Sequence, residues 1–124
     1  MSDIIYKDEA FEIIGICMDI HNELGSGFSE IVYKDALELE LSSKQISYER
    51  EKSYTILYKG IPLDHKFYAD FIVLDKIILE IKCVKLIADE HVAQTIIYLK
   101  ASGNKLGIII NFGKEKLDYK RIVY

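Results

Sequence analysis

The sequence has one proline, two cysteines, three histidines and no tryptophan. Its two cysteines, Cys17 and Cys83, form no C-x-x-C pair, which favours small apolar side chains in a reducing cytosol over a disulfide framework. The histidines His21, His65 and His91 are scattered, so their spacing indicates neither zinc nor a catalytic triad. A disulfide-stapled or zinc-stabilised fold is therefore not expected.

Long apolar runs are also missing. No run approaches the ~20 residues that a membrane helix needs, and the first residues lack the basic and apolar regions of a signal peptide. We therefore expect a cytoplasmic protein with no membrane partner. Half of the 124 residues are hydrophobic and 29% are charged, which is typical of an ordered globular chain, and the length predicts a single domain over residues 1–124.

An excess of basic charge is absent. The formal net charge is −4: residues 1–43 carry two basic and ten acidic side chains, whereas residues 100–124 carry six basic and two acidic ones. This balance argues against strong, unaided, non-specific DNA binding, which depends on many lysine and arginine contacts to phosphate. It does not exclude a nuclease whose bound metal offsets its carboxylates.

Hydrophobic periodicity and turn signals predict eight elements. Two helices come first, one over residues 4–24 and one from Ser29, which can act as its cap, to about residue 45. We expect the inner face of the first helix to carry Phe11, Ile14, Cys17 or Met18, and His21. Strands are expected over residues 47–59, 67–74 and 76–84, a helix over 89–102, and strands over 106–112 and 118–123. This α-α-β-β-β-α-β-β order predicts an α/β fold with helices flanking a mixed sheet.

Charged residues interrupt two apolar runs of the predicted sheet. Asp70 lies within residues 68–74, and Glu80 and Lys82 lie within residues 77–84. Burial of a charged group is costly unless the group is paired or binds a metal. The spacing Asp-x9-Glu-x-Lys therefore predicts a divalent-metal phosphodiesterase centre, in which carboxylates hold Mg²⁺ (or Mn²⁺) and the lysine orients or deprotonates water or stabilises negative charge. The plainer alternative is an ordinary aspartate and a Glu–Lys pair on a solvent-facing strand surface.

The loop between the second and third strands decides whether the two acids meet. Side chains alternate along a strand, so Glu80 and Lys82 share one face. A two-residue turn would pair Asp70 with Ile81 and place the acids on opposite faces, whereas a three-residue loop over residues 74–76 pairs Asp70 with Glu80. The metal-site hypothesis therefore requires an odd loop or a β-bulge.

Two helices carry further candidates. In the third helix, His91, Gln94 and Tyr98 fall on one face, opposite the expected apolar core stripe. Beside an acidic metal site an amide and a phenol can hold water or phosphate, although alone they are ordinary surface residues. Glu30 lies in the first turn of the second helix, where an acid alone would simply complement the helix dipole.

The segment Gly27-x-x-Glu30-x-x-Tyr33 resembles the small bacterial and archaeal GxxExxY protein family. Segments further along agree in order: Tyr58-Lys-Gly60, Tyr68-Ala-Asp70, Ile78-Leu-Glu80-Ile-Lys82, Gln94-x-x-x-Tyr98 and Asn111-Phe-Gly113. That family is similar to the PD-(D/E)xK nuclease superfamily, particularly its RecB-like branch with a Q-x-x-x-Y helix motif. The resemblance covers nearly the whole chain, and Ala69 stands where the proline of the superfamily's label would be.

The resemblance implies a restriction-endonuclease-like core and a Mg²⁺- or Mn²⁺-dependent nuclease that hydrolyses DNA. It implies a role at each matching position: metal carboxylates at Asp70 and Glu80, a carbonyl ligand at Ile81, a supporting acid at Glu30, a catalytic lysine at Lys82, and support of the site or contact with the DNA backbone at Gln94 and Tyr98. Because nothing in the chain resembles a DNA-recognition domain, we expect a homodimer or a protein partner to supply specificity.

Three functions from different classes stay open. The first is the DNA nuclease, acting as an endonuclease or an exonuclease. The second is a catalytically silent nucleic-acid-binding or adaptor module with the same fold. The third is an interaction protein in which Glu30, Asp70, Glu80 and Lys82 form a structural ion network. The presence of all three acids and the lysine favours the first.

Overall fold

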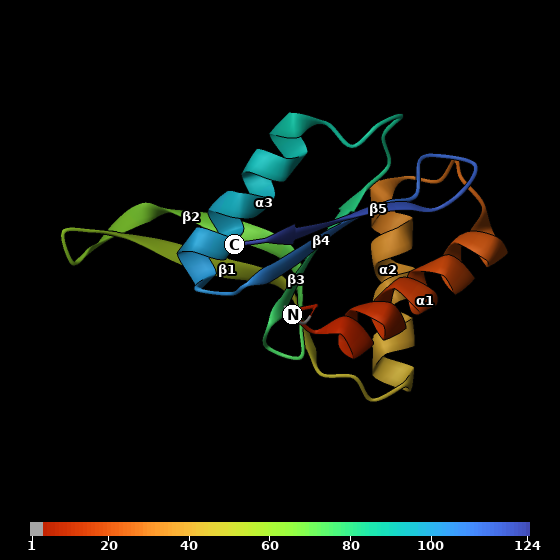
Figure 1. Ribbon diagram of the computed structural model, residues 1–124, viewed down its shortest axis with the longest axis horizontal. Coiled ribbons are helices and arrows are strands. Elements are labelled where there is room, and N and C mark those ends of the chain that lie inside the picture. Colours follow the sequence, from red (N-terminus) through yellow and green to blue (C-terminus); the bar gives the residue numbers. More distant parts are fainter. Residues whose placement is uncertain (1–3) are drawn as a thin grey trace.

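The computed structural model describes residues 4–124, which form three helices and one five-stranded sheet in the predicted order (Figure 1). The helices are α1 (Lys7–Leu24), α2 (Glu30–Ser43) and α3 (Asp89–Ser102), and the strands are β1 (Tyr48–Tyr58), β2 (Ile61–Val73), β3 (Ile77–Lys82), β4 (Leu106–Asn111) and β5 (Asp118–Val123). The strands lie side by side in chain order, and neighbours are antiparallel except for β3 and β4, which are parallel. The predicted α/β fold with a mixed sheet is therefore confirmed.

A hydrophobic core lies on each face of the sheet. Helices α1 and α2 cover one face, where Leu79 and Ile81 of β3 are buried, and α3 covers the other, where Ile78 is buried (Figure 1). Residues of β3 therefore alternate between the two cores, and all six residues of β4 are buried. A strand covered on both faces reads as a nearly continuous apolar run, which explains the isoleucine-rich segments of the sequence.

Two details of the first helices differ from the prediction. Helix α1 begins at Lys7, and Phe11, which we expected on its inner face, is 80% exposed. Apolar residues occur around enough of this helix that periodicity alone left its inner face ambiguous; the face consists of Ala10, Ile13, Ile14, Ile16, Cys17, Ile20 and His21. Ser29 does precede α2 in the capping position, but its side chain makes no capping hydrogen bond.

Both cysteines lie in or against the hydrophobic core, as their interpretation as small apolar side chains predicted. Cys17 is buried and Cys83 is half-buried against the same core, and both are free thiols. Among residues 4–124, none of the helices combines the length and the apolar character that crossing a bilayer would require.

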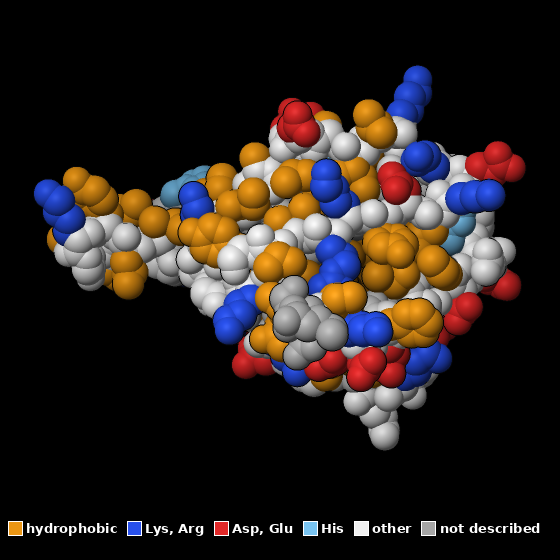
Figure 2. Space-filling view, in the orientation of Figure 1, with side chains coloured by type: hydrophobic (Ala, Val, Ile, Leu, Met, Phe, Trp, Pro, Cys, Tyr) orange, Lys and Arg blue, Asp and Glu red, His pale blue; other side chains and the backbone are white. Residues whose placement is uncertain are grey.

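The hairpin of β1 and β2 extends beyond the body of the molecule as an arm (Figure 1). Strand β2 begins at Ile61, six residues before the predicted start. Its first part pairs with β1 alone, and its side chains there are exposed and do not alternate between buried and exposed positions. Because of Pro62 and the polar residues after it, this part of the sequence lacks the apolar pattern that predicts a strand. The tip carries exposed apolar side chains, including Leu57 and Tyr58, and Figure 2 shows hydrophobic side chains along the arm.

The loop between β2 and β3 has the odd length that the site hypothesis requires. Phe71 pairs with Leu79 and Val73 pairs with Ile77, so residues 74–76 form a three-residue loop. Its first two residues lie in the left-handed region, with φ of 56° and 57°, as in the tight turns that match the twist of hairpins. The same register, continued by one residue, places Asp70 opposite Glu80.

The C-terminal ends of β3 and β4 are clamped together. Asn111 is fully buried and its side chain accepts hydrogen bonds from the N–H groups of Val84 and Gly113 and donates one to the Val84 carbonyl. The N–H of Phe112 donates to the Lys82 carbonyl at 2.8 Å. These contacts fix the end of β3, which carries Lys82.

The substitution Gly113→Ala tests this clamp. An added Cβ would lie 2.5 Å from the Val84 nitrogen and 2.6 Å from its oxygen, both backbone atoms that cannot move aside. We expect the free energy of unfolding in urea to fall by about 1–3 kcal/mol or more.

The matched control is Gly15→Ala in α1, where an added Cβ meets nothing within 4 Å. Alanine is the better helix former, so Gly15→Ala should stabilise by up to about 1 kcal/mol. Equal effects of the two substitutions would contradict the clamp.

Candidate functional site

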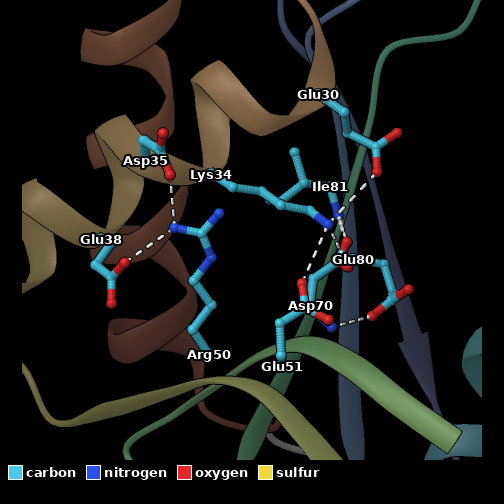
Figure 3. A network of polar contacts seen from close by, with 9 residues as sticks. All are labelled: Glu30, Lys34, Asp35, Glu38, Arg50, Glu51, Asp70, Glu80 and Ile81. Atoms are coloured by element: carbon cyan, nitrogen blue, oxygen red, sulfur yellow. Dashed lines mark hydrogen bonds and ion pairs between the residues drawn. The ribbon is translucent and has the colours of Figure 1, made fainter.

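Asp70 and Glu80 hold β2 and β3 together where the backbone pairing ends. The Asp70 N–H donates to Glu80 Oε2 at 2.8 Å, and the Ile81 N–H donates to Asp70 Oδ2 at 2.7 Å (Figure 3). Each carboxylate therefore takes the place of a backbone carbonyl of the opposite strand. Both residues are buried, at 8% and 3% exposure. The structure thus brings together the two acids that the three-residue loop was predicted to align.

Strand β1 is distorted directly opposite Asp70. Glu51 has a φ of 53°, and its backbone pairing with Asp70 is missing although the pairs on either side are kept. On β2, Phe71 packs with α1 and α2 whereas Ala69 packs in the core under α3, although residues two apart share a face in a regular strand. Asp70 lies at this change of face, and from there it reaches both α2 and β3.

Lys34 of α2 completes the acidic cluster, and the sequence analysis missed it. Its Nζ lies 2.8 Å from Asp70 Oδ1, 3.4 Å from Glu51 Oε1 and 3.7 Å from Glu30 Oε1 (Figure 3). Burial by itself would lower the pKa of Lys34, but the hydrogen bond and charge of Asp70, with the charges of Glu51 and Glu30, raise that pKa above its ordinary value. The available signal was its position four residues after Glu30, which puts both on one helix face.

The turn before α2 determines where Glu30 lies. Gly27 has a φ of 113°, a conformation that glycine adopts without strain. The Tyr33 hydroxyl donates to the Gly25 carbonyl, and its ring stacks on Phe112 with centroids 4.4 Å apart. The glycine and the tyrosine of the Gly-x-x-Glu-x-x-Tyr segment therefore brace the turn, and Glu30 between them begins the helix.

Lys82 lies at the end of β3 on the same face as Glu80, as strand alternation predicted. Its Nζ donates to Gln94 Oε1 at 3.3 Å. Within residues 4–124, Lys82 takes part in no ion pair, and the cation that contacts Asp70 is Lys34 instead. The ion network considered as an alternative, among Glu30, Asp70, Glu80 and Lys82, is therefore not the one that forms in residues 4–124: Glu30 and Asp70 pair with Lys34, and Glu51 joins them.

The three polar residues predicted on one face of α3 separate in the structure. His91 Nδ1 accepts a hydrogen bond from the Ala88 N–H at 2.9 Å and caps the helix. Gln94 is exposed and contacts Lys82. Tyr98 is buried, so its assignment to the exposed face was wrong.

Tyr98 still lies close to the acids. Its ring packs edge-on against Phe67 in the core under α3. Burial, together with the negative charges of Glu80 and Asp70, raises the pKa of Tyr98 to about 12. The phenol therefore keeps its proton at neutral pH and can act as a hydrogen-bond donor beside the carboxylates.

Glu80 favours its protonated form in this environment. Burial and, to a smaller extent, the negative charge of Asp70 raise the pKa of Glu80 to about 8, against the opposing effects of the Asp70 N–H, Lys82 and Lys34. An additional cation beside the two carboxylates would favour the ionised form. The pair is thus poised to release a proton when positive charge approaches.

The donor atoms at this site suit a hard divalent cation. Asp70 and Glu80 present carboxylate oxygens from facing strands, the ligand type that Mg²⁺ and Mn²⁺ prefer. Across residues 4–124, however, no three side chains of the His, Cys, Asp and Glu types are gathered as a metal-binding group. In Figure 3 the Lys34 ammonium lies between Glu30 and Asp70, the third acid and the first.

The raised pKa of Glu80 predicts how stability depends on pH in the presence of EDTA. Between the ordinary glutamate pKa and about 8, the folded protein retains a proton that the unfolded chain has released, so the free energy of unfolding falls as pH rises. Glu80→Gln keeps an acceptor for the Asp70 N–H and removes the titration. Between those two pH values the free energy of unfolding of Glu80→Gln should fall less steeply than that of wild type, with a difference in slope of up to about 1.4 kcal/mol per pH unit.

Urea unfolding from pH 5 to pH 9 measures this difference. Glu12→Gln, which changes an exposed acid of α1, is the matched control and should follow the wild-type pH dependence. Parallel curves for Glu80→Gln and wild type would contradict the raised pKa.

Two solved structures share this fold. The crystal structure of SSO0001 matches with a TM-score of 0.60 and 22% identity, over 95% of this chain and 57% of that chain. The crystal structure of an alkaline exonuclease (LHK-Exo) from Laribacter hongkongensis matches with a TM-score of 0.54 and 12% identity, over 99% of this chain and 72% of that chain. The chain thus spans little more than half the length of SSO0001. The predicted restriction-endonuclease-like core is confirmed.

The sequence comparisons give the family. No curated protein matches the chain. The family model described as the PD-(D/E)XK nuclease superfamily matches residues 7–122, which include every candidate site residue. The chain therefore belongs to the PD-(D/E)XK nuclease superfamily.

Proposed function

We propose that this chain is a divalent-metal-dependent nuclease that hydrolyses phosphodiester bonds in DNA. The observation that carries the proposal is the interlocked pair of Asp70 and Glu80, with Lys82 on the same strand face, within a nuclease-superfamily fold. The alkaline exonuclease among the structural neighbours supports a nucleic acid as the substrate.

The metal-binding residues in this proposal are those implied by the resemblance. Asp70 and Glu80 would hold Mg²⁺ or Mn²⁺, with the Ile81 carbonyl and Glu30 completing the shell. The bound ion would polarise a phosphoryl oxygen and lower the pKa of a water molecule. Interlocking with the backbone keeps both carboxylates in place, because each accepts a hydrogen bond from the opposite strand.

Lys82 is the proposed catalytic lysine. Its ammonium would orient the attacking water or stabilise the negative charge that develops on the phosphate. Gln94 accepts a hydrogen bond from Lys82 Nζ and so directs it along the face that carries Glu80. Tyr98, whose hydroxyl stays protonated near the acids, would support the site as a donor.

We place the chain, within its superfamily, in the GxxExxY family and the RecB-like branch. The support is that Gly27 and Tyr33 brace the turn that positions Glu30, which gives each residue of the motif a physical role. The setting we propose is the cytoplasm of a prokaryote, with residues 1–124 as one nuclease-like domain. A second copy or a protein partner would supply sequence or strand specificity.

The second candidate is a catalytically silent nucleic-acid-binding or adaptor module with the same fold. The observation that favours it is the Lys34 ammonium on Asp70 Oδ1, an oxygen that a metal would use. Such a module would bind DNA equally well with and without metal, whereas the nuclease requires metal for turnover.

Cleavage of labelled single- and double-stranded DNA with Mg²⁺ or Mn²⁺ tests the nuclease. Lys82→Ala should lower the cleavage rate by about 100-fold or more, because it removes the charge that stabilises the transition state. Lys44→Ala, which affects only an exposed ion pair with Glu40, should retain the wild-type rate. Highly purified wild type that cuts with neither metal would favour the binding module.

Gln94→Ala separates the positioning of the lysine from its presence. The lysine keeps its charge but loses its acceptor, so we expect the cleavage rate to fall by about tenfold, less than for Lys82→Ala. Because Gln94 is exposed, the free energy of unfolding of Gln94→Ala should stay within about 0.5 kcal/mol of the wild-type value. The control is Glu90→Ala, an exposed change on the same helix, and equal rates for both variants would exclude this role of Gln94.

A further inference from the structure

The ion pair between Lys34 and Asp70 differs from the others in the protein. Both side chains are only 12% exposed, whereas every other ion pair of residues 4–124 includes a side chain that is at least 31% exposed. Withdrawing a lysine and an aspartate from water is costly unless their mutual attraction compensates. The pair is therefore a specific feature of this site and not part of the general surface charge.

The two oxygens of Asp70 have different partners. Oδ2 accepts the hydrogen bond from the Ile81 N–H, which closes the β2–β3 junction. Among the described residues, the hydrogen bonds and ion pairs of Oδ1 are limited to the one with Lys34 Nζ. Oδ1 is thus the oxygen through which Asp70 can serve a metal without opening the sheet, and the lysine uses that same atom.

The Lys34 ammonium is held by acids from three different elements. Glu30 comes from α2, Glu51 from β1 and Asp70 from β2, and all three lie within 3.7 Å of Nζ (Figure 3). Convergence of carboxylates from separate elements on one cation is also what a divalent metal site requires. The lysine therefore contacts two of the carboxylates that the proposed metal shell would use, Asp70 and Glu30.

We propose that Lys34 is a built-in competitor for the metal and sets the affinity of the site. Its ammonium must leave Asp70 Oδ1 before a divalent ion can bind that oxygen. This inference rests on the metal dependence proposed above. Lys34 acts through Asp70 and is therefore a positioning residue and not a catalytic one.

Glu51 provides a second place for the displaced ammonium. Its side chain is 53% exposed, it already lies 3.4 Å from Lys34 Nζ, and the proposed metal shell does not use it. The four-carbon stem of lysine is flexible enough to carry Nζ outward to Glu51. Metal binding thus moves the lysine ammonium to a more solvent-exposed position, where its charge is neither buried nor unpaired.

Binding of Mn²⁺ to the full chain without DNA, measured by calorimetry, tests this competition. Lys34→Met removes the charge and keeps an apolar stem, so Mn²⁺ should bind about tenfold more tightly or better. Lys34→Arg keeps the charge and should stay within about threefold of wild type. Lys44→Met, which removes an exposed lysine of the same helix region, should leave the affinity unchanged.

Thermal unfolding gives an independent readout. In EDTA, Lys34→Met should melt at a lower temperature than wild type, because Asp70 loses its buried counter-charge. Saturating Mn²⁺ should raise its melting temperature more than it raises that of wild type. Should Lys34→Met fail to fold, Lys34→Gln, which retains a donor for Asp70, is measured in the same way.

The outcomes separate this inference from the proposed function. Wild-type or weaker Mn²⁺ affinity in the uncharged Lys34 variants, with binding abolished in Asp70→Asn, would overturn the competition and leave the metal site intact. Mn²⁺ binding that Asp70→Asn does not alter would overturn both the competition and the proposed metal site. Tighter binding in the uncharged variants alone would establish Lys34 as the competitor.

Discussion

The exchange of hydrogen bonds between two carboxylates and two backbone N–H groups is the interaction on which this site depends. The backbone pairing of β2 with β3 ends at the pair Phe71 and Leu79. The next pair, Asp70 and Glu80, continues the junction with its side chains. Leaving either buried N–H unpaired would cost about 1–3 kcal/mol. The acids of the site are therefore also part of the sheet, and amide replacements, which keep an acceptor, separate their chemistry from their structural role.

A distortion in the neighbouring strand gives this junction its access to α2. Glu51 adopts a left-handed conformation opposite Asp70, and β2 changes the face that it presents between Ala69 and Phe71. Backbone strain of this kind persists where surrounding contacts over-determine it, and it occurs often at functional sites. Here the distortion lies directly opposite Asp70, which contacts Lys34, so the strained residue and the buried ion pair belong to one arrangement.

Sequence reasoning succeeded where the relevant pattern is local and failed where it depends on neighbours. The element order and the bounds of α3 and β5 followed from periodicity and turn signals, whereas the length of the β2–β3 loop was left open between two and three residues. The inner face of α1 was misjudged at Phe11, because apolar residues surround much of that helix. The first half of β2 was missed because it pairs only with β1. Tyr98 was placed outside because helical spacing put it on one face with His91 and Gln94, opposite the expected core stripe.

The sequence by itself determined that Lys82 shares a strand face with Glu80, and that Asp70 opposes Glu80 only if the loop between their strands is odd. Strand alternation is a local property, which a linear sequence specifies directly. The length of the loop was left open by the sequence, and the structure decided that it has three residues. Only the tertiary structure decided that Lys34 contacts Asp70 and that Lys82 contacts Gln94. Those pairings depend on which helix packs over which part of a twisted sheet, and that is set by the combined packing of all the elements and not by the spacing of any one segment.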